Sequence, residues 1–220
     1  MARKPKIVVF GAGGHAKVVV DVLAQMKRYE VVALLDDSAA LHGTRRWGFK
    51  VWGGREQFST LRKRSVRGLI VGLGDNQRRQ SVYEEAAKAG VKLITAVHPS
   101  VHLGGRVTIG AGSLLVAGTV INVDAVIGEN VIINTGATVD HDCRIGAHVH
   151  LSPGVHLAGG VTVGELTHIG IGAVVLPNVQ VGRACIVGAG AVVLDSVPDG
   201  AVVAGNPARP IKAGDTFHGA

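Results

Sequence analysis

The segment IGENVIINTGATVDHDCRI, residues 127–145, decides the fold of this chain. It belongs to a longer stretch in which an aliphatic residue stands at every sixth position from Val97 to Val193, and the phase never slips. We call these residues the hexad aliphatics. A strict short period with one inward apolar position is typical of a β-solenoid, in which each repeat buries its apolar side by stacking on its neighbours.

Glycine indicates the size of one coil. It recurs every eighteen residues, directly after a hexad aliphatic, at Gly110, Gly128, Gly146, Gly164 and Gly182. Three hexads then make one coil of a three-sided column. The residue two places before each hexad aliphatic is small or β-branched, as a narrow interior requires. The residue after it is often Gly, Asn or Asp, so we expect this position to turn the corners with positive φ.

The charge of the chain indicates an acidic partner. The formal net charge is +7, and aromatic residues make up only 4% of the sequence. The Lys and Arg residues are scattered and not interleaved with aromatics, so we expect no nucleic acid as partner, whereas a phosphate-bearing small molecule explains the same sign. The apolar run 6–10 is too short for a signal peptide, and no longer run spans a membrane.

The two cysteines, Cys143 and Cys185, are forty-two residues apart, which is not a multiple of eighteen. We expect them on different sides of the column, buried and unpaired. Free thiols and the lack of a signal peptide favour a cytoplasmic protein that does not associate with a membrane.

The composition changes where the repeat begins, so we predict two domains, 1–97 and 98–220. The first is expected to be a small Rossmann-like parallel α/β unit. Apolar runs predict strands at Lys6–Phe10, Val31–Leu35, Gly68–Leu73 and Val91–Val97, and helical spacing predicts helices at Ala16–Met26 and Gln77–Ala89. We also expect a helix with a solvated face over the basic run Arg62–Arg67.

A glycine loop follows the first strand. Gly11, Gly13 and Ala16 match the G-x-G-x-x-[GA] fingerprint, and Asp36 lies about twenty-five residues further on. Loop amides at a helix N-terminus bind phosphate readily. Only one short sheet unit is present, so a mononucleotide sugar fits better than a dinucleotide. A glycine turn that merely lets strand and helix pack is the competing interpretation.

The histidines cluster, since five of ten fall between residues 141 and 168. His141 is flanked by Asp140 and Asp142, and flanking carboxylates can fix the tautomer of an imidazole and raise its basicity, as a general base requires. A surface imidazole beside solvated acids is the alternative. A zinc site is a third possibility, but the histidine spacing does not favour it, and we expect no metal.

An unbroken hexad phase leaves no room for an inserted loop that is not a multiple of six long. A smooth column makes a poor pocket by itself, so we expect the site where columns adjoin, or where a column meets the N-terminal unit of a neighbour. This predicts a homo-oligomer, and three-fold packing of three-sided columns is the natural closed form.

Several motifs together resemble one family. They are FGAGGHA at the start, DD at 36–37, GDN at 74–76, NTGATVDHDC at 134–143 and AGNPAR at 204–209. They are similar to the bacterial nucleotide-sugar N-acetyltransferases, and most of all to those that acetylate the 4-amino group of 4-amino-4,6-dideoxy sugars such as GDP-perosamine for polysaccharide and O-antigen synthesis. The resemblance implies a left-handed parallel β-helix as an acyltransferase domain over 98–220, a nucleotide-sugar-binding domain over 1–97, a homotrimer and acetyl-CoA as donor.

Site residues follow from the resemblance, motif by motif. His141 is the implied catalytic base and Asp142 its acidic partner. Contacts to acetyl-CoA are implied for His150, for the backbone amide of Gly159 facing the thioester oxygen, and for the main chain of Ile171 and Ala189. The implied nucleotide-sugar site comprises Gly13, Gly14, His15, Asp36, Asp37, Gly74 and Asn76.

Alternatives stay open at this point. A UDP-linked bacillosamine-type N-acetyltransferase is the nearest one, and O-acetylation of a sugar or of sialic acid would use the same base. From other classes, the chain could be a nucleotide-sugar-binding scaffold without catalysis or a zinc-dependent hydratase.

Overall fold

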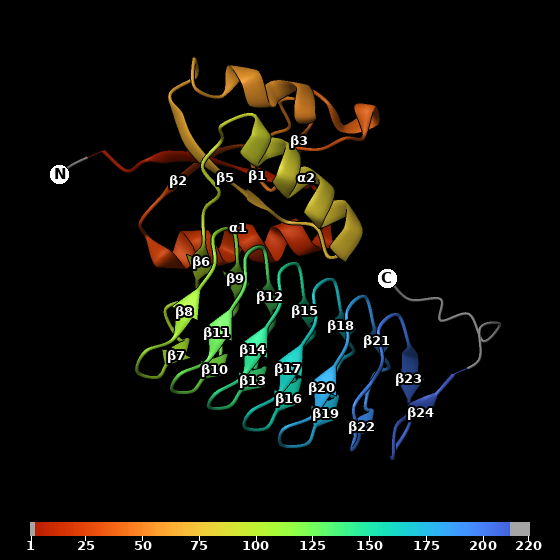
Figure 1. The fold of residues 1–220 in the computed structure, drawn as a ribbon. Coiled ribbons are helices and arrows are strands. Elements are labelled where there is room, and N and C mark those ends of the chain that lie inside the picture. Colours follow the sequence, from red (N-terminus) through yellow and green to blue (C-terminus); the bar gives the residue numbers. More distant parts are fainter. Residues whose placement is uncertain (1–2, 212–220) are drawn as a thin grey trace. The chain divides into compact units, whose positions relative to one another are not determined.

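A computed structural model describes residues 3–211 (Figure 1). Residues 1–2 and 212–220, which the predicted domains include, lie outside the described range. The described chain forms two compact units. The first holds the residues up to Pro99 together with Ala111–Ser113, and the second holds Ser100–Gly110 and the residues from Leu114 onward.

A three-stranded parallel sheet is the centre of the N-terminal unit, with strand order β2-β1-β5. This confirms the predicted small parallel α/β unit. Its strands are β1 (Lys6–Phe10), β2 (Glu30–Leu35) and β5 (Val66–Val71), and its helices are α1 (Gly14–Met26) and α2 (Asn76–Lys88). Shorter elements are η1 (Ala39–Leu41), β3 (Arg45–Arg46), β4 (Phe49–Lys50), η2 (Arg55–Thr60) and β6 (Ala96–Val97).

Two predictions for this unit are wrong in detail. The basic run Arg62–Arg67 is not a helix, because Val66 already belongs to β5 and pairs with Lys6, and the residues between η2 and β5 are too few for anything but turns. The predicted strand Val91–Val97 contracts to β6, and Leu93 makes only an isolated bridge to Leu69.

The second unit is a parallel β-solenoid, as the period predicts, and Figure 1 shows its successive coils from green to blue. Nearly every strand has two residues, and strands one coil apart pair in parallel, as Val120 and Ile121 do with Thr138 and Val139. The first sheet contains β7 (His102–Leu103), β10 (Val120–Ile121), β13 (Thr138–Val139), β16 (His156–Leu157), β19 (Val174–Val175) and β22 (Val192–Val193).

The second sheet contains β8 (Thr108–Ile109), β11 (Val126–Ile127), β14 (Arg144–Ile145), β17 (Thr162–Val163) and β20 (Gln180–Val181). The third contains β9 (Leu114–Leu115), β12 (Ile132–Ile133), β15 (His150–Leu151), β18 (His168–Ile169), β21 (Ile186–Val187) and β23 (Val202–Ala204). There β23 also pairs antiparallel with β24 (Arg209–Pro210), within the AGNPAR motif.

The hexad aliphatics fill the interior of the column. From Leu115 to Val193 every one of them is buried, and so is the small residue two places earlier. The predicted pattern of inward positions is therefore confirmed from Leu115 onward, whereas Leu103 in the first coil is 42% exposed. Cys143 and Cys185 are buried and free, and they precede strands of different sheets. No helix among the described residues is long and apolar enough to cross a membrane.

Positive φ lies two positions later than predicted. It falls three residues after the hexad aliphatic, for example at Asp124, Asn130, Gly136 and Asp142. The glycine directly after the hexad aliphatic has a different reason. A Cβ on Gly128 would lie 2.8 Å from the nitrogen of Ala147 in the next coil, so glycine there lets the coils stack.

Candidate active site

His141 lies in the corner between the first and second sheets, just after β13, and its side chain is 57% exposed. Its Nδ1 is 2.7 Å from Oδ2 of Asp142. Asp142 has φ 59°, the left-handed conformation that Asp tolerates better than most residues. The carboxylate is an acceptor only, so Nδ1 carries the proton of the neutral ring and Nε2 keeps its lone pair.

Asp140 holds the backbone of the same corner. Its Oδ1 accepts from the His141 amide at 2.7 Å and from Nδ2 of Asn122, one coil earlier, at 2.8 Å. The hydrogen bond to Asp142 raises the pKa of His141 above its usual value, and the charge of Asp140 adds to this. The corner therefore presents an imidazole of increased basicity, which a proton acceptor needs.

Gly159 lies one coil beyond His141 and directly against its ring. A Cβ on Gly159 would sit 2.6 Å from both Cε1 and Nε2 of that ring. The amide of Gly160 donates to the carbonyl of His141 at 2.9 Å, which fixes the two coils in register. Within residues 3–211 no backbone carbonyl accepts from the amide of Gly159. This corner thus combines a basic nitrogen with a nearby backbone donor.

The predicted acetyl-CoA contacts do not all lie in this corner. His150 is in β15 of the third sheet, 8% exposed, and its ring packs on that of His168 at a centroid distance of 4.8 Å. Ile171 and Ala189 lie one coil apart in the corner between the third and first sheets, and the amide of Gly190 donates to the Ile171 carbonyl at 2.8 Å. Ile171 is 61% exposed. One column therefore presents the predicted acetyl-CoA contacts at two separate places. Gly159 lies in the His141 corner, whereas His150, Ile171 and Ala189 lie in or just after strands of the third sheet.

The glycine loop of the N-terminal unit contains two kinds of glycine. Gly11 has φ +119°, and a Cβ there would be 2.8 Å from the carbonyl oxygen of Gly72, so the fold itself requires glycine. At Gly13 and Gly14 no described atom lies within 4 Å of an added Cβ, and neither has positive φ. The fold does not require glycine at these two exposed positions, whereas a group that approaches the backbone closely would.

The start of α1 suits an anion. Gly13 is the N-cap residue, no side chain caps the helix, and its first turn has no acidic residue. No side chain of the helix itself therefore compensates the N–H groups of the first turn or the positive end of the helix dipole, and the carboxylate of Asp36 accepts from the amide of Ala12 just before the helix. His15 follows in the first turn, and burial lowers its pKa to about 4, with the charge of Arg79 adding to the effect. Its imidazole is thus neutral near pH 7.

Asp36 and Asp37 have different tasks at the end of β2. Asp36 accepts from the amide of Ala12 at 2.9 Å with Oδ2 and from that of Ser38 at 2.9 Å with Oδ1. Asp36 therefore ties the glycine loop to the next turn. Asp37 is more exposed and forms an ion pair with Arg55 at 3.0 Å.

Gly74 and Asn76 follow β5, at the same carboxyl edge of the sheet as the glycine loop. At Gly74 an added Cβ would have no described atom within 4 Å, and its φ is not positive. Asn76 is 8% exposed, and its Oδ1 accepts from Nη2 of Arg79 at 2.8 Å. The structure brings all seven predicted nucleotide-sugar residues to this edge, on the loops after β1, β2 and β5 and in the first residues of α1 and α2.

Sequence reasoning missed Arg55 and Arg79. Arg79 shares the buried face of α2 with Val82, Tyr83 and Ala86. This i, i+3, i+4, i+7 spacing places an arginine on an apolar face, and that signal was available in the sequence. Nothing comparable marks Arg55, because its partners are distant along the chain.

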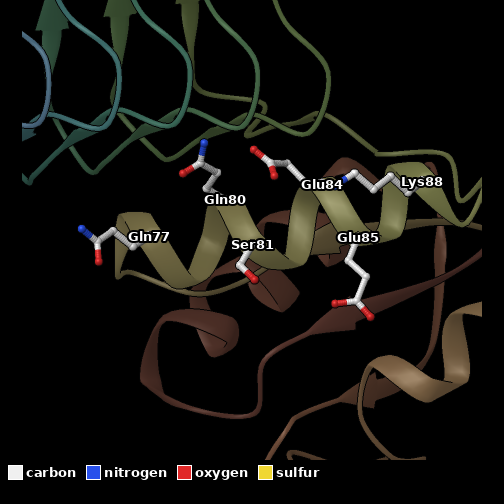
Figure 2. Close-up of a pocket in the computed structure, with 6 residues that line it drawn as sticks. All are labelled: Gln77, Gln80, Ser81, Glu84, Glu85 and Lys88. Carbon is white, nitrogen blue, oxygen red and sulfur yellow. The ribbon is translucent and has the colours of Figure 1, made fainter.

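Figure 2 shows a polar depression along α2, lined by Gln77, Gln80, Ser81, Glu84, Glu85 and Lys88. Two of its side chains are already engaged, because Nη1 of Arg55 donates to Ser81 at 2.7 Å and to Glu85 at 3.0 Å. We assign it a structural task, the connection of η2 to α2. Residues 3–211 contain no group of three His, Cys, Asp or Glu side chains placed to hold a metal ion.

Comparisons with known proteins cover both units. The family model of the PglD N-terminal domain matches residues 6–86, and that of the bacterial transferase hexapeptide (six repeats) matches 124–159 and 160–195. The acetyltransferase domain of PglB from Neisseria gonorrhoeae FA1090 is 40% identical over 94% of this chain and 100% of its own, with a TM-score of 0.89. It has also been solved in complex with acetyl coenzyme A.

PerB from Caulobacter crescentus, solved with CoA and GDP-perosamine, is 42% identical over 96% of this chain and 99% of its own, with a TM-score of 0.89. WeeI from Acinetobacter baumannii AYE is 30% identical over 94% of this chain and 100% of its own, with a TM-score of 0.84. The resemblance inferred from the motifs is confirmed: this chain belongs to the nucleotide-sugar N-acetyltransferases that join a PglD N-terminal domain to a hexapeptide-repeat solenoid and use acetyl-CoA as donor.

Proposed function

We propose that this enzyme acetylates the 4-amino group of a nucleotide-linked 4-amino-4,6-dideoxy sugar, with GDP-perosamine as the first substrate to test, in the synthesis of a polysaccharide such as O-antigen. The arrangement of His141 on Asp142, with Gly159 against the ring, carries the chemistry. The likeness to a GDP-perosamine-bound enzyme at 42% identity supports the choice of sugar.

The proposed mechanism starts from the proton on the substrate nitrogen. As the amine attacks the thioester carbonyl it must lose a proton, and Nε2 of His141 accepts it while Asp142 stabilises the imidazolium. The Gly159 amide donates to the oxyanion of the tetrahedral intermediate, and such a donor is worth about 3 kcal/mol. The intermediate collapses as the C–S bond breaks, and CoA leaves as a thiolate.

The diphosphate group of the nucleotide sugar is proposed to bind at the start of α1. The open positions at Gly13, Gly14 and Gly74 let phosphate and sugar oxygens approach the backbone. His15 is neutral at physiological pH and can donate or accept a hydrogen bond there. Asp37 and Asn76 flank the same edge and supply polar groups for the nucleoside and the sugar, while Asp36 shapes the loop.

Acetyl-CoA binding supports a homo-oligomer, and we propose a trimer. One column presents the His141 corner and the corner of Ile171 and Ala189 at different places. One extended acetyl-CoA molecule can contact both corners if the His141 corner of one protomer faces the Ile171 and Ala189 corner of a neighbouring protomer. His150 would then lie beside the same molecule. Three-fold packing of three-sided columns satisfies this for each protomer.

The two domains are proposed to divide the work, with nucleotide-sugar binding in 1–97 and acyl transfer in 98–220. We also propose a cytoplasmic location. The two buried free thiols fit a reducing compartment.

The deciding experiment offers acetyl-CoA with GDP- and UDP-linked 4-amino sugars and measures the release of free thiol. Acetylation of GDP-perosamine with the highest kcat/KM supports the proposal. Faster turnover of UDP-linked 4-amino sugars assigns the bacillosamine-type reaction, and turnover of 4-hydroxy analogues at equal rate assigns O-acetylation. Binding of nucleotide sugar without any thiol release contradicts catalysis and leaves a binding scaffold.

A further inference from the structure

Arg79 is a buried cation near the predicted nucleotide-sugar residues. It is 1% exposed, although arginine is rarely buried so completely. Burial lowers its pKa to about 9, partly offset by the charge of Asp75. Removing a guanidinium from water is costly unless its donors are satisfied. The acceptors of the Arg79 guanidinium therefore indicate which part of the chain this side chain holds in place.

Three hydrogen bonds of Arg79 converge on the segment between β5 and α2. Nη1 donates to the carbonyl oxygens of Leu73 at 3.3 Å and Gly74 at 3.1 Å, and Nη2 donates to Oδ1 of Asn76 at 2.8 Å. One guanidinium thus fixes the path of the loop between β5 and α2. Because Oδ1 of Asn76 accepts from Arg79, the donor group Nδ2 lies on the other arm of the same planar amide.

This loop packs directly on the glycine loop. A Cβ on Gly11 would lie 2.8 Å from the carbonyl oxygen of Gly72, and a Cβ on Gly72 would lie 2.9 Å from Cα of Ala16. A shift of the β5–α2 loop therefore disturbs the start of α1. The charge of Arg79 also acts on His15, where it contributes to the lowered pKa. Arg79 thus holds one loop by hydrogen bonds, and its positive charge lies close enough to the first turn of α1 to act on His15.

We propose that Arg79 is a positioning residue for the diphosphate-linked substrate. It holds Gly74 and Asn76 in the conformation that faces the ligand, and it places a buried positive charge behind the glycine loop that receives the diphosphate. This inference rests on the proposed function, because it takes the nucleotide sugar as the ligand of this edge. Acetyl-CoA binds elsewhere in that proposal, so its affinity serves as an internal reference.

The test compares three variants of the full chain by calorimetry with GDP, UDP and CoA as ligands. R79M removes the charge and the donors at similar volume, and R79K keeps a charge but not the fork that reaches three acceptors. R78M is the matched control, because Arg78 is the adjacent arginine of α2 and its side chain is exposed. We expect R79M to weaken binding of the preferred nucleoside diphosphate at least tenfold, R79K at least threefold and R78M less than twofold, with CoA affinity unchanged within twofold.

Steady-state kinetics supply the second measurement. A positioning role raises KM for the nucleotide sugar far more than KM for acetyl-CoA, whereas general loss of structure affects both. An R79M or R79K variant with unchanged nucleoside diphosphate affinity overturns the proposal, and so does an equal loss of diphosphate and CoA affinity. If R79M does not fold, R79K, N76A and the double variant R79K/N76A decide. Because Arg79 is proposed to act through Asn76, the double variant should lose no more nucleoside diphosphate affinity than the larger of the two single losses.

The two proposals fail differently. If neither GDP nor UDP binds the wild-type chain, the assigned nucleotide-sugar edge is wrong. If one of them binds and the Arg79 variants bind it as tightly as R78M does, the function stands and the positioning role is wrong.

Discussion

A methyl group on Gly159 would lie 2.6 Å from Nε2 of His141, so the backbone of Gly159, whose amide is the proposed oxyanion donor, lies close against the ring of the proposed proton acceptor. Because they are one coil apart, the eighteen-residue register places them together without any long-range loop.

Gly159→Ala tests this relationship. The added Cβ must displace the imidazole, so we expect kcat to fall roughly 10²-fold, as for loss of acid–base catalysis. Gly105→Ala is the matched control, because Gly105 also stands two places after a hexad aliphatic and its Cβ would come no closer than 4.0 Å to its nearest neighbour. Equal turnover of the two variants would remove Gly159 from the site.

His141→Ala should lower kcat by about 10²-fold or more while substrate affinity changes little, because the side chain acts on the proton and contributes little to binding. His102→Ala is the control, since His102 is another exposed histidine of the solenoid and lies in β7 of the first sheet. Turnover near that of the wild type after loss of His141 would exclude it as the base.

Asp142→Asn should move the pH profile of kcat/KM. The hydrogen bond to Asp142 is the main cause of the raised pKa of His141, so its weakening lowers that pKa and shifts the rising limb toward lower pH. The plateau should fall less than in His141→Ala. Asp124→Asn, at the same corner position one coil earlier, should leave the limb in place. A larger loss from Asp142→Asn than from His141→Ala would reverse the assigned roles.

His15 predicts an acid-dependent loss of stability. Its pKa is about 4 in the folded chain against 6.5 for an ordinary histidine, so the unfolded chain binds the extra proton first as the pH falls. Stability is unaffected above 6.5 and decreases between 6.5 and about 4, by roughly 3 kcal/mol for such a shift. Denaturant unfolding of wild type and His15→Gln across this range measures it. Parallel curves for the two proteins would contradict the shift.

Gly128→Ala tests the stacking of coils. Its Cβ would lie 2.8 to 3.0 Å from backbone atoms of the next coil, and overpacking of this kind costs about 1–3 kcal/mol. The melting temperature should fall, while Gly105→Ala should leave it close to that of the wild type. No difference between the two would mean that the coils can separate freely at this position.

Chelation should not reduce turnover. The proposed reaction uses an imidazole and a backbone amide, and the described residues offer no three-residue metal site. Thiol release before and after treatment with EDTA measures this directly. A loss of activity that added zinc restores would favour the hydratase-type alternative.

The solenoid could be predicted from the sequence because the six-residue pattern that specifies it is local. One inward aliphatic residue in six and one small residue two places earlier are enough to specify a coil, and the positions from Leu115 to Val193 are buried as expected. The positive-φ corner was predicted two residues too early, because composition alone cannot separate a glycine needed for positive φ from one needed for close stacking. Gly128 and Gly136 are these two cases.

The sequence by itself determined the fold class, the family and the identity of His141 and Asp142 as neighbours, since all three depend on short-range pattern. Only the tertiary structure decided that Gly159 lies against that imidazole, that Asp36 is engaged by two backbone amides while Gly13 and Gly14 stay open, and that Arg79 reaches three acceptors of one loop. Those relationships are distances between atoms brought together by strand stacking and helix packing, and the order of residues along a chain does not contain them.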